Sequence, residues 1–315
     1  TSSWPERSGN MALVPFDDRD GSIWINGEMV PWRDATSHTL SHGLHYASTV
    51  FEGERVYSGV IFKGREHTER LRNSCKIMDF ELPLGDDELD AAKMAVVEAN
   101  GIVDGYVRAF AWRGSEMMAI SAQHTTTHVA IAAWEWPSYM DPNAKMNGIS
   151  VVKSSHKQYD NPLHSGNKII GTYFSNTMAL HEALDKGADE AIMFDKNGFI
   201  SEGSGENLFL VKNDILFTPT TMHCLNGITR QSVIEIASDS NYDVEEKNLE
   251  YEDLRNADEA FFTGTAVEIT PITKLDNHKI NDGKRGKVIK KLQEKFNKII
   301  CGDDKTYEDW LSFVK

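Results

Sequence analysis

Asn161-Pro-Leu-His-Ser-Gly-Asn-Lys168-Ile-Ile-Gly-Thr-Tyr173 is a polar, glycine-bearing loop that places one lysine directly before an apolar, helix-like run. An amine held at such a junction is partly desolvated, which lowers the pKa of the lysine and makes it a nucleophile toward a carbonyl group. We therefore predict that Lys168 is a catalytic residue that forms a Schiff base. The alternative, from this stretch alone, is a solvated surface lysine beside the start of a helix.

The composition of the chain is that of a globular protein. It has 315 residues, of which 40% are hydrophobic and 26% are charged, and this length favours two domains. The net charge of -15 argues against a nucleic-acid partner, because phosphate contacts need clustered positive charge. It also gives no attraction to an anionic membrane surface. We therefore expect small-molecule partners.

The cysteines and the hydropathy pattern bear on the cellular compartment. Cys75, Cys224 and Cys301 are far apart and lack a zinc-type spacing, which is typical of reduced thiols. No apolar run approaches the ~18 residues that a membrane span needs. These two features predict a cytoplasmic protein.

A change of composition at Pro137–Gly148, a stretch rich in proline, asparagine and glycine, marks the boundary between two domains. We expect an N-terminal extension at residues 1–20 and a small domain at 21–143. A linker at 144–149 then leads to a large domain at 150–315.

The first domain has the pattern of a sheet covered by helices. Alternating apolar residues around an Asn-Gly pair predict a hairpin over Ser22–Trp32. Helices are predicted over 65–79 and 87–100, and strands over 106–112 and 128–134. Strands and helices therefore alternate in this half of the chain.

Three histidines raise the possibility of a metal site. His38, His42 and His45 are four and three residues apart, so on a helix they would share one face. No carboxylate or cysteine completes the set, and Gly43 weakens the helix. Local packing and hydrogen bonding is the alternative interpretation, and we expect no metal.

The second domain holds candidate partners for the lysine. After a helix predicted over 173–186, Glu202 lies where a strand runs into glycines, so its carboxylate either projects into a cleft or belongs to a solvated turn. The helix that begins at Asn226-Gly-Ile-Thr229, with Thr229 as the expected cap, presents backbone N–H groups to an anion. The small residues of 263–266 offer a second patch of such groups.

These residues resemble those of the branched-chain amino acid aminotransferases, pyridoxal-phosphate enzymes of fold type IV. The resemblance runs from about Gly21 to the C-terminus. Its most specific pieces are Ser41-His-Gly-Leu-His-Tyr46, Val50-Phe-Glu-Gly53, Arg65-Glu-His, Ile200-Ser-Glu202-Gly-Ser-Gly-Glu-Asn-Leu-Phe209, Gly227-Ile-Thr-Arg230 and Gly264-Thr-Ala-Val-Glu-Ile-Thr-Pro271. It implies an α/β (α+β) protein with a small N-terminal α/β domain, a larger C-terminal domain, and the cofactor at their interface.

The resemblance also implies roles around pyridoxal 5'-phosphate. Lys168 would carry the cofactor and move the proton between the substrate α carbon and the cofactor's C4' carbon. Glu202 would pair with the pyridinium nitrogen, and Tyr173 would hydrogen-bond the phenolic oxygen. Further cofactor contacts are implied for Leu225 on the ring and, at the phosphate, for Arg65, Ile228, Thr229 and Thr265.

The implied substrate pocket must accept both an aliphatic side chain and the side-chain carboxylate of glutamate. Aromatic walls suit the first, and an arginine with tyrosine hydroxyls suits the second. By resemblance, the pocket residues are Tyr46, Phe51, Gly53, Tyr106, Arg108, Trp136 and Tyr139, with the backbone of Thr265 and Ala266 facing the α-carboxylate. Ile120 would reach in from a neighbouring subunit.

The implied activity is a reversible ping-pong amino transfer between L-leucine, L-isoleucine or L-valine and 2-oxoglutarate. The resemblance implies that the enzyme is a homodimer or a dimer-based higher oligomer and that it acts in branched-chain amino acid biosynthesis. The sequence departs from the family beside the lysine, at Ile169, Ile170 and Thr172, and in Thr220-Thr-Met-His-Cys224. Both departures concern which substrate side chains the enzyme prefers. Alternatives are a D-amino acid aminotransferase or an aminodeoxychorismate lyase of the same fold, and a non-catalytic protein that holds a metal through the three histidines.

Overall fold

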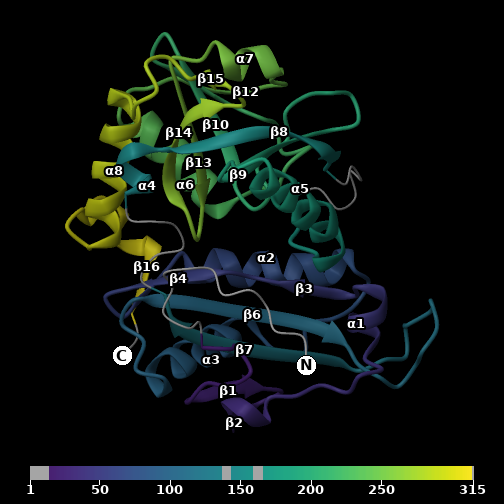
Figure 1. The fold of residues 1–315 in the computed structure, drawn as a ribbon. Helices are drawn as coiled ribbons and strands as arrows, with labels where there is room; N and C mark the ends of the chain where they lie inside the picture. Colours follow the sequence, from purple (N-terminus) through teal and green to yellow (C-terminus); the bar gives the residue numbers. More distant parts are fainter. Residues whose placement is uncertain (1–13, 137–142, 159–165, 314–315) are drawn as a thin grey trace.

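A computed structural model describes residues 14–136, 143–158 and 166–313. Within these residues the chain forms two α/β units, each built on an eight-stranded sheet, with one unit above the other in Figure 1. Helix α2 lies between the first sheet and the second unit in that view. The predicted α/β (α+β) fold class is confirmed.

The first sheet is antiparallel and has the strand order β16-β5-β4-β6-β7-β1-β2, with β3 paired to β6. Its hairpin is confirmed, and the Asn26-Gly27 turn has the positive φ values of 50° and 103° that a two-residue type I' loop needs. The strands are β1 Ser22–Ile25, β2 Glu28–Pro31, β3 Thr49–Phe51, β4 Glu54–Tyr57, β5 Val60–Phe62, β6 Gly105–Arg113, β7 Thr127–Glu135 and β16 Leu311–Phe313.

Two long helices cover one face of this sheet. They are α2 at Gly64–Ile77 and α3 at Asp86–Ala99, each beginning one residue before the predicted start. Their apolar faces pack with the inward-facing residues of β6 and β7 in one buried cluster. The short helices η1 (Trp32–Asp34) and α1 (His42–Tyr46) lie in the connections.

The second sheet is mixed and has the order β12-β11-β10-β13-β14-β8-β9, with β15 paired to β14. Its strands are β8 Ile149–Lys157, β9 Glu190–Phe194, β10 Asn207–Lys212, β11 Ile215–Thr218, β12 Val244–Glu246, β13 Glu259–Gly264, β14 Glu268–Leu275 and β15 His278–Lys279. Its helices are α4 Ala144–Asn147, η2 Ile170–Thr172, α5 Tyr173–Asp185, α6 Ile228–Asp239, α7 Tyr251–Arg255, α8 Lys287–Ile300 and η3 Lys305–Trp310.

One helix start differs from its prediction. Thr229 was expected to cap α6, but the N-cap is Gly227 and Thr229 lies inside the first turn. A Cβ at position 227 would lie 2.0 Å from the side-chain oxygen of Asn207. Glycine therefore lets the helix begin close to β10.

The last described residues return to the first sheet. Strand β16 pairs with β5, so that Leu311 faces Phe62, and Trp310 packs on the Phe62 ring at a centroid distance of 5.9 Å. The residues of β16 fall within the expected large domain at 150–315, yet they pair with a strand of the first sheet. The division into 1–20, 21–143, 144–149 and 150–315 stays a proposal.

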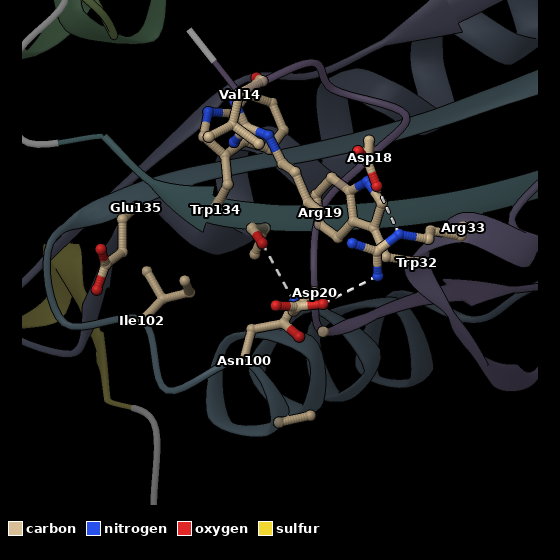
Figure 2. A pocket seen from close by; sticks show the side chains of 13 residues that line it. Val14, Asp18, Arg19, Asp20, Trp32, Arg33, Asn100, Ile102, Trp134 and Glu135 are labelled. Carbon is tan, nitrogen blue, oxygen red and sulfur yellow. Dashed lines mark hydrogen bonds and ion pairs between the residues drawn. The ribbon is translucent and has the colours of Figure 1, made fainter. Parts of the chain in front are cut away.

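The segment at residues 14–20 lies against the first sheet. The indole N–H of Trp32 donates to the Phe16 carbonyl at 2.5 Å, and Arg33 forms ion pairs with Asp18 and Asp20. Figure 2 shows the hollow that this segment borders, with Trp134 on its wall. In the described part of the chain, no helix is both long enough and apolar enough to cross a bilayer.

Candidate active site

A cavity lies where the two units meet. The first unit contributes Gly53, Arg70 and Tyr106, and the second contributes Lys168, Tyr173 and Glu202 together with the segments at 227–229 and 263–266. The structure therefore brings together the lysine, the carboxylate and the two N–H-bearing segments that the sequence singled out.

Lys168 is tied to the first unit through its backbone. Its N–H donates to the Ser74 hydroxyl at 3.2 Å, its carbonyl accepts from the Phe51 N–H at 3.2 Å, and Ile169 forms a β-bridge with Val50. The side-chain amine donates to the Tyr173 hydroxyl at 2.6 Å. Asn161–Ser165, the first part of the lysine loop, lies outside the described residues.

The cavity makes the Lys168 amine easier to deprotonate. Burial is the main cause, and the positive charge of Arg70 adds to it, so the pKa of Lys168 falls to about 7. A lysine with this pKa is a nucleophile at neutral pH, as covalent catalysis through an amine requires.

Glu202 is held rigidly in the same cavity. One carboxylate oxygen accepts from the Leu225 N–H at 3.0 Å and from the Asn207 amide at 3.2 Å, and the other accepts from the Gln158 amide at 2.6 Å. Burial raises the pKa of Glu202 to about 7, although the Leu225 N–H opposes this. Because the second oxygen can accept one more hydrogen bond, a cationic N–H in the cavity would fit there and keep the carboxylate ionised.

A second part of the cavity lining suits an anion. Ile228 and Thr229, in the first turn of α6, line it, and the first N–H groups of a helix have no partner within the helix. Thr265 lines it from the β13–β14 loop. The hydroxyl of Thr263 is buried in the same wall and has no hydrogen-bond partner among the described residues. A phosphate fits these donors.

The arginine of this cradle is Arg70, and the prediction of Arg65 is wrong. Arg70 lines the cavity, whereas Arg65 lines a separate hollow and forms ion pairs with Asp87 and Asp90. The two arginines are five residues apart on α2, which places them about 140° apart around the helix axis. Arg65 therefore points away from the cavity.

Arg70 is oriented by a buried carboxylate. Its guanidinium donates to both oxygens of Glu52 at 2.6 and 2.8 Å and to the Asn226 carbonyl at 3.0 Å. The ring nitrogen Nδ1 of His67 also contacts a Glu52 oxygen, at 2.6 Å. Burial alone would raise the pKa of Glu52, but Arg70 and His67 outweigh it and hold that pKa well below its usual range.

An aromatic and cationic wall lies on the first-unit side. The Arg108 guanidinium lies 4.4 Å from the centre of the Phe51 ring and donates to the Tyr106 hydroxyl at 3.2 Å. The Lys168 amine is 4.7 Å from the centre of the Phe51 ring. A Cβ on Gly53 would lie 1.9 Å from the Tyr106 hydroxyl, so this wall needs glycine at position 53.

The other expected pocket residues lie at different distances from the cavity. Trp136 packs on Tyr106 at a ring-centroid distance of 4.9 Å, and Leu225 and Ala266 line the cavity. Tyr46 stacks on His42, and Ile120 is 88% exposed, and neither residue lines the cavity of a single chain. The prediction for Tyr139 falls outside the described residues.

Several cavity residues were not predicted. Asn207 orients Glu202, and Asn176 and Glu206 line the wall. Arg70 had a usable signal, because it shares the buried face of α2 with His67, Leu71 and Ser74 at helical spacing. The other three are polar residues in a strand, a helix and a loop, where the sequence pattern does not separate them from ordinary structural positions.

The three histidines do not meet at one point. His42 contacts the Ser48 hydroxyl and the Ala119 carbonyl, and His45 contacts the Thr39 carbonyl. Among residues 14–136, 143–158 and 166–313, no group of three histidine, cysteine or carboxylate side chains is placed to hold a metal ion. The structure gives the metal-binding alternative no support.

The cavity fits a particular kind of cofactor. It combines a nucleophilic amine, a carboxylate that can pair with a cationic ring nitrogen, and a phosphate cradle. An aromatic aldehyde that carries a ring nitrogen and a phosphate meets all three.

Comparison with known proteins identifies close relatives. A family model described as amino-transferase class IV matches residues 49–275. The branched-chain-amino-acid aminotransferase of Pseudomonas aeruginosa is 42% identical over 303 residues, which are 95% of this chain and 99% of that protein.

Solved structures agree with this similarity. The Escherichia coli branched-chain amino acid aminotransferase has a TM-score of 0.92 and 38% identity, over 94% of this chain and 100% of that one. The T.th. branched-chain amino acid aminotransferase complexed with N-(5'-phosphopyridoxyl)-L-glutamate has a TM-score of 0.90 and 38% identity, over 94% of this chain and 99% of that one.

Proposed function

Because the chain belongs to the class IV aminotransferases, we propose that it is a branched-chain amino acid aminotransferase, with pyridoxal 5'-phosphate as its cofactor. The observation that carries this proposal is the meeting of Lys168, Tyr173 and Glu202 in one cavity with an anion cradle. The curated relatives support this substrate class over a D-amino acid aminotransferase or an aminodeoxychorismate lyase.

When bound, pyridoxal phosphate supplies an electron sink that stabilises negative charge on the α carbon of an amino acid. We assign the proton transfer at that carbon to the amine of Lys168, whose pKa of about 7 lets it both accept and return a proton at neutral pH. Tyr173 holds this amine by a hydrogen bond of 2.6 Å.

The cofactor's two ends are assigned to opposite sides of the cavity. Glu202, fixed by Asn207 and the Leu225 N–H, would pair with the ring nitrogen and keep it protonated. The α6 N-terminus at Ile228 and Thr229, with Thr265 and Arg70, would hold the phosphate, and Leu225 would pack on the ring.

Both kinds of substrate side chain have a place in the proposed pocket. The rings of Phe51, Tyr106 and Trp136 suit the aliphatic side chains of leucine, isoleucine and valine. The guanidinium of Arg108 and the Tyr106 hydroxyl suit the side-chain carboxylate of glutamate and 2-oxoglutarate. The backbone of Thr265 and Ala266 faces the α-carboxylate.

We also propose that two copies of the chain form a homodimer through an apolar surface, which we call the α1–α5 patch: Leu44, Tyr46, Ile120, Ile170, Phe174 and Met178, all exposed in one chain. The segments that carry these residues adjoin one another, because His42 of α1 contacts the Ala119 carbonyl, and a Cβ on Gly171 would lie 3.4 Å from that of Ala47. Exposed apolar surface of this kind is typical of an interface. Ile120 would then approach the partner's cavity.

We place the reaction in the cytoplasm, in branched-chain amino acid biosynthesis. The support for the compartment is that Cys75, Cys224 and Cys301 are free thiols. Cell fractionation with an antibody against the chain tests it, and recovery in an oxidising compartment would contradict it.

The substrate assignment is tested by single half-reactions. The holoprotein is mixed separately with L-leucine, L-isoleucine, L-valine, L-glutamate, D-alanine and aminodeoxychorismate, and the cofactor's absorption is followed. We expect the four L-amino acids to convert the cofactor to its amine form. Conversion by D-alanine alone, or pyruvate release from aminodeoxychorismate alone, would overturn the proposal.

A further inference from the structure

Glu268 adopts a backbone conformation that is unusual for its residue type. It begins β14 with a φ of 53°, in the left-handed region that favours glycine. The strand register pairs it with Gly264 across the three-residue loop Thr265–Val267. A three-residue hairpin connection commonly closes with one left-handed residue at a bulge, and glycine is the residue best suited to that position. The glutamate side chain therefore calls for an explanation.

The side chain of Glu268 joins three separate parts of the molecule. It is buried, and one carboxylate oxygen accepts a hydrogen bond of 3.1 Å from the hydroxyl of Tyr57, in β4 of the first sheet. The other oxygen accepts from the amine of Lys145, in α4. One carboxylate therefore connects the loop to the first unit and to the helix that precedes β8.

Both partners of this carboxylate are themselves fixed. Gln293 of α8 donates to the carbonyls of Lys145 at 3.0 Å and Ile269 at 2.9 Å, which ties α4 to the start of β14. Tyr57 is buried in the same apolar cluster as Ile269 and Phe296, so its hydroxyl is held at the contact between the two units. Movement of either partner would disturb the loop.

The loop that Glu268 closes lies on the cavity wall. Thr265 and Ala266 line the cavity, and Val267 is held by a hydrogen bond of 2.7 Å from the Thr270 hydroxyl to its carbonyl. We propose that Glu268 is a positioning residue: its carboxylate fastens the Thr265–Val267 loop to Tyr57 and Lys145 and so keeps the loop backbone in place for the substrate's α-carboxylate. The substrate part of this inference rests on the proposed function, whereas the fastening does not.

The test replaces Glu268 by residues that separate its backbone role from its side-chain role. Glu268→Gly suits the positive φ but removes both contacts, Glu268→Gln keeps the size and an acceptor for Tyr57 but loses the charge, and Tyr57→Phe removes one hydroxyl. A purely local backbone role predicts that the glycine variant is the least harmed. Fastening predicts that it is the most harmed.

Asp276 provides a matched control at the other end of β14. It also has a positive φ, 49°, and its carboxylate accepts a hydrogen bond of 2.6 Å from Tyr251, but both residues belong to the second unit and neither lines the cavity. Asp276→Gly therefore removes an equivalent contact away from the site. We expect its KM values to match those of the unaltered protein.

Two measurements on the holoprotein decide the matter. Amide hydrogen exchange over residues 264–268 is expected to speed up about tenfold in Glu268→Gly and less in the other two variants, because each buried hydrogen bond to a charged group limits local opening. The KM for L-leucine and 2-oxoglutarate is expected to rise about tenfold in Glu268→Gly, with kcat changed less than about threefold, because the loop acts on binding. Glu268→Gln and Tyr57→Phe should be intermediate.

The inference would be overturned if Glu268→Gly had the same hydrogen-exchange rate and the same KM as the unaltered protein. It would also be overturned if Asp276→Gly changed both quantities as much as Glu268→Gly does. Should Glu268→Gly fail to fold, Tyr57→Phe carries the same test through the loss of one hydroxyl. If the unaltered protein transfers no amino group from any branched-chain amino acid, the proposed function fails. The exchange comparison would still decide whether Glu268 fastens the loop.

Discussion

The amine of Lys168 donates a hydrogen bond of 2.6 Å to the phenolic oxygen of Tyr173. Burial lowers the pKa of Lys168 to about 7 and raises the pKa of Tyr173 far above its usual range. Near neutral pH, about half of the Lys168 amines are therefore neutral, and the amine lies beside a phenol that keeps its proton. This is the protonation state in which an amine attacks an aldehyde.

The first prediction concerns the pH dependence of cofactor attachment. The rate at which cofactor-free protein binds pyridoxal phosphate covalently should rise with pH through about 7 and level off above it, because only the neutral Lys168 amine reacts. Stopped-flow absorbance between pH 5.5 and 9 measures this. A rate that was still rising about tenfold per pH unit at pH 9, as for an unperturbed lysine, would contradict the assigned environment.

The same pKa predicts the stability of a Lys168→Met variant. The folded-state pKa of about 7 lies below the usual 10.5, so burial of the charged amine destabilises the folded cofactor-free protein most below pH 7. This penalty declines between pH 7 and 10.5 and is absent above that range. We expect the variant to have the higher unfolding temperature at pH 6 and the difference to shrink by pH 10. Calorimetry on both cofactor-free proteins measures it.

The third prediction separates the roles of Arg65 and Arg70 in α2. Arg70→Lys should weaken pyridoxal phosphate binding by about tenfold, because lysine cannot reproduce the two parallel bonds to Glu52 that orient the guanidinium. Arg65→Lys is the matched control and should change the affinity less than about twofold, since its ion pairs are on the surface. Equilibrium dialysis measures the affinity of both variants for pyridoxal phosphate. A larger loss of affinity in Arg65→Lys than in Arg70→Lys would support Arg65 as the phosphate-binding arginine.

The fourth prediction concerns Gly53. Gly53→Ala should raise the KM for L-leucine by about tenfold, because the new methyl group would lie 1.9 Å from the Tyr106 hydroxyl and displace the wall formed with Arg108. Adding Tyr106→Phe removes the colliding oxygen. Steady-state kinetics should therefore show a lower KM for L-leucine in the double variant than in Gly53→Ala. A KM in the double variant that is higher than in both single variants would argue against the collision.

The fifth prediction tests the α1–α5 patch. Phe174→Asp should raise the dimer dissociation constant by roughly 100-fold, because it places a charge on an apolar interface. Val103→Asp, at an exposed apolar residue outside the patch, is the control and should leave it unchanged. Sedimentation velocity measures both. A dimer that tolerates Phe174→Asp would remove the patch from the interface.

The local parts of the fold were predictable, and the distant ones were not. The Ser22–Trp32 hairpin and helices α2 and α3 follow from turn residues and apolar periodicity within short windows. The pairing of β16 with β5 joins residues about 250 positions apart, and no local pattern encodes it. The Gly227 cap was missed for a related reason, since it depends on the approach of Asn207.

In the candidate site, too, the residues in local sequence motifs were predictable and those that depend on tertiary contacts were not. Lys168, Glu202, Thr229 and Thr265 lie in motifs whose chemistry shows in the sequence, and the structure places all four on one cavity, although their roles stay predictions. Arg70 was missed because α2 carries three arginines, Arg65, Arg70 and Arg72, and the choice of Arg65 did not use the helical spacing that places Arg70 on the buried face. The positive φ of Glu268 is a tertiary feature, supported by contacts with Tyr57 and Lys145.

The most direct measurement of the central claim is to reduce the holoprotein with borohydride and map the labelled peptide by mass spectrometry. We predict one phosphopyridoxyl group per chain, on Lys168, and none in Lys168→Met prepared in the same way. A label on any other lysine, or an unchanged label in the variant, would contradict the assignment of Lys168 as the residue that carries the cofactor.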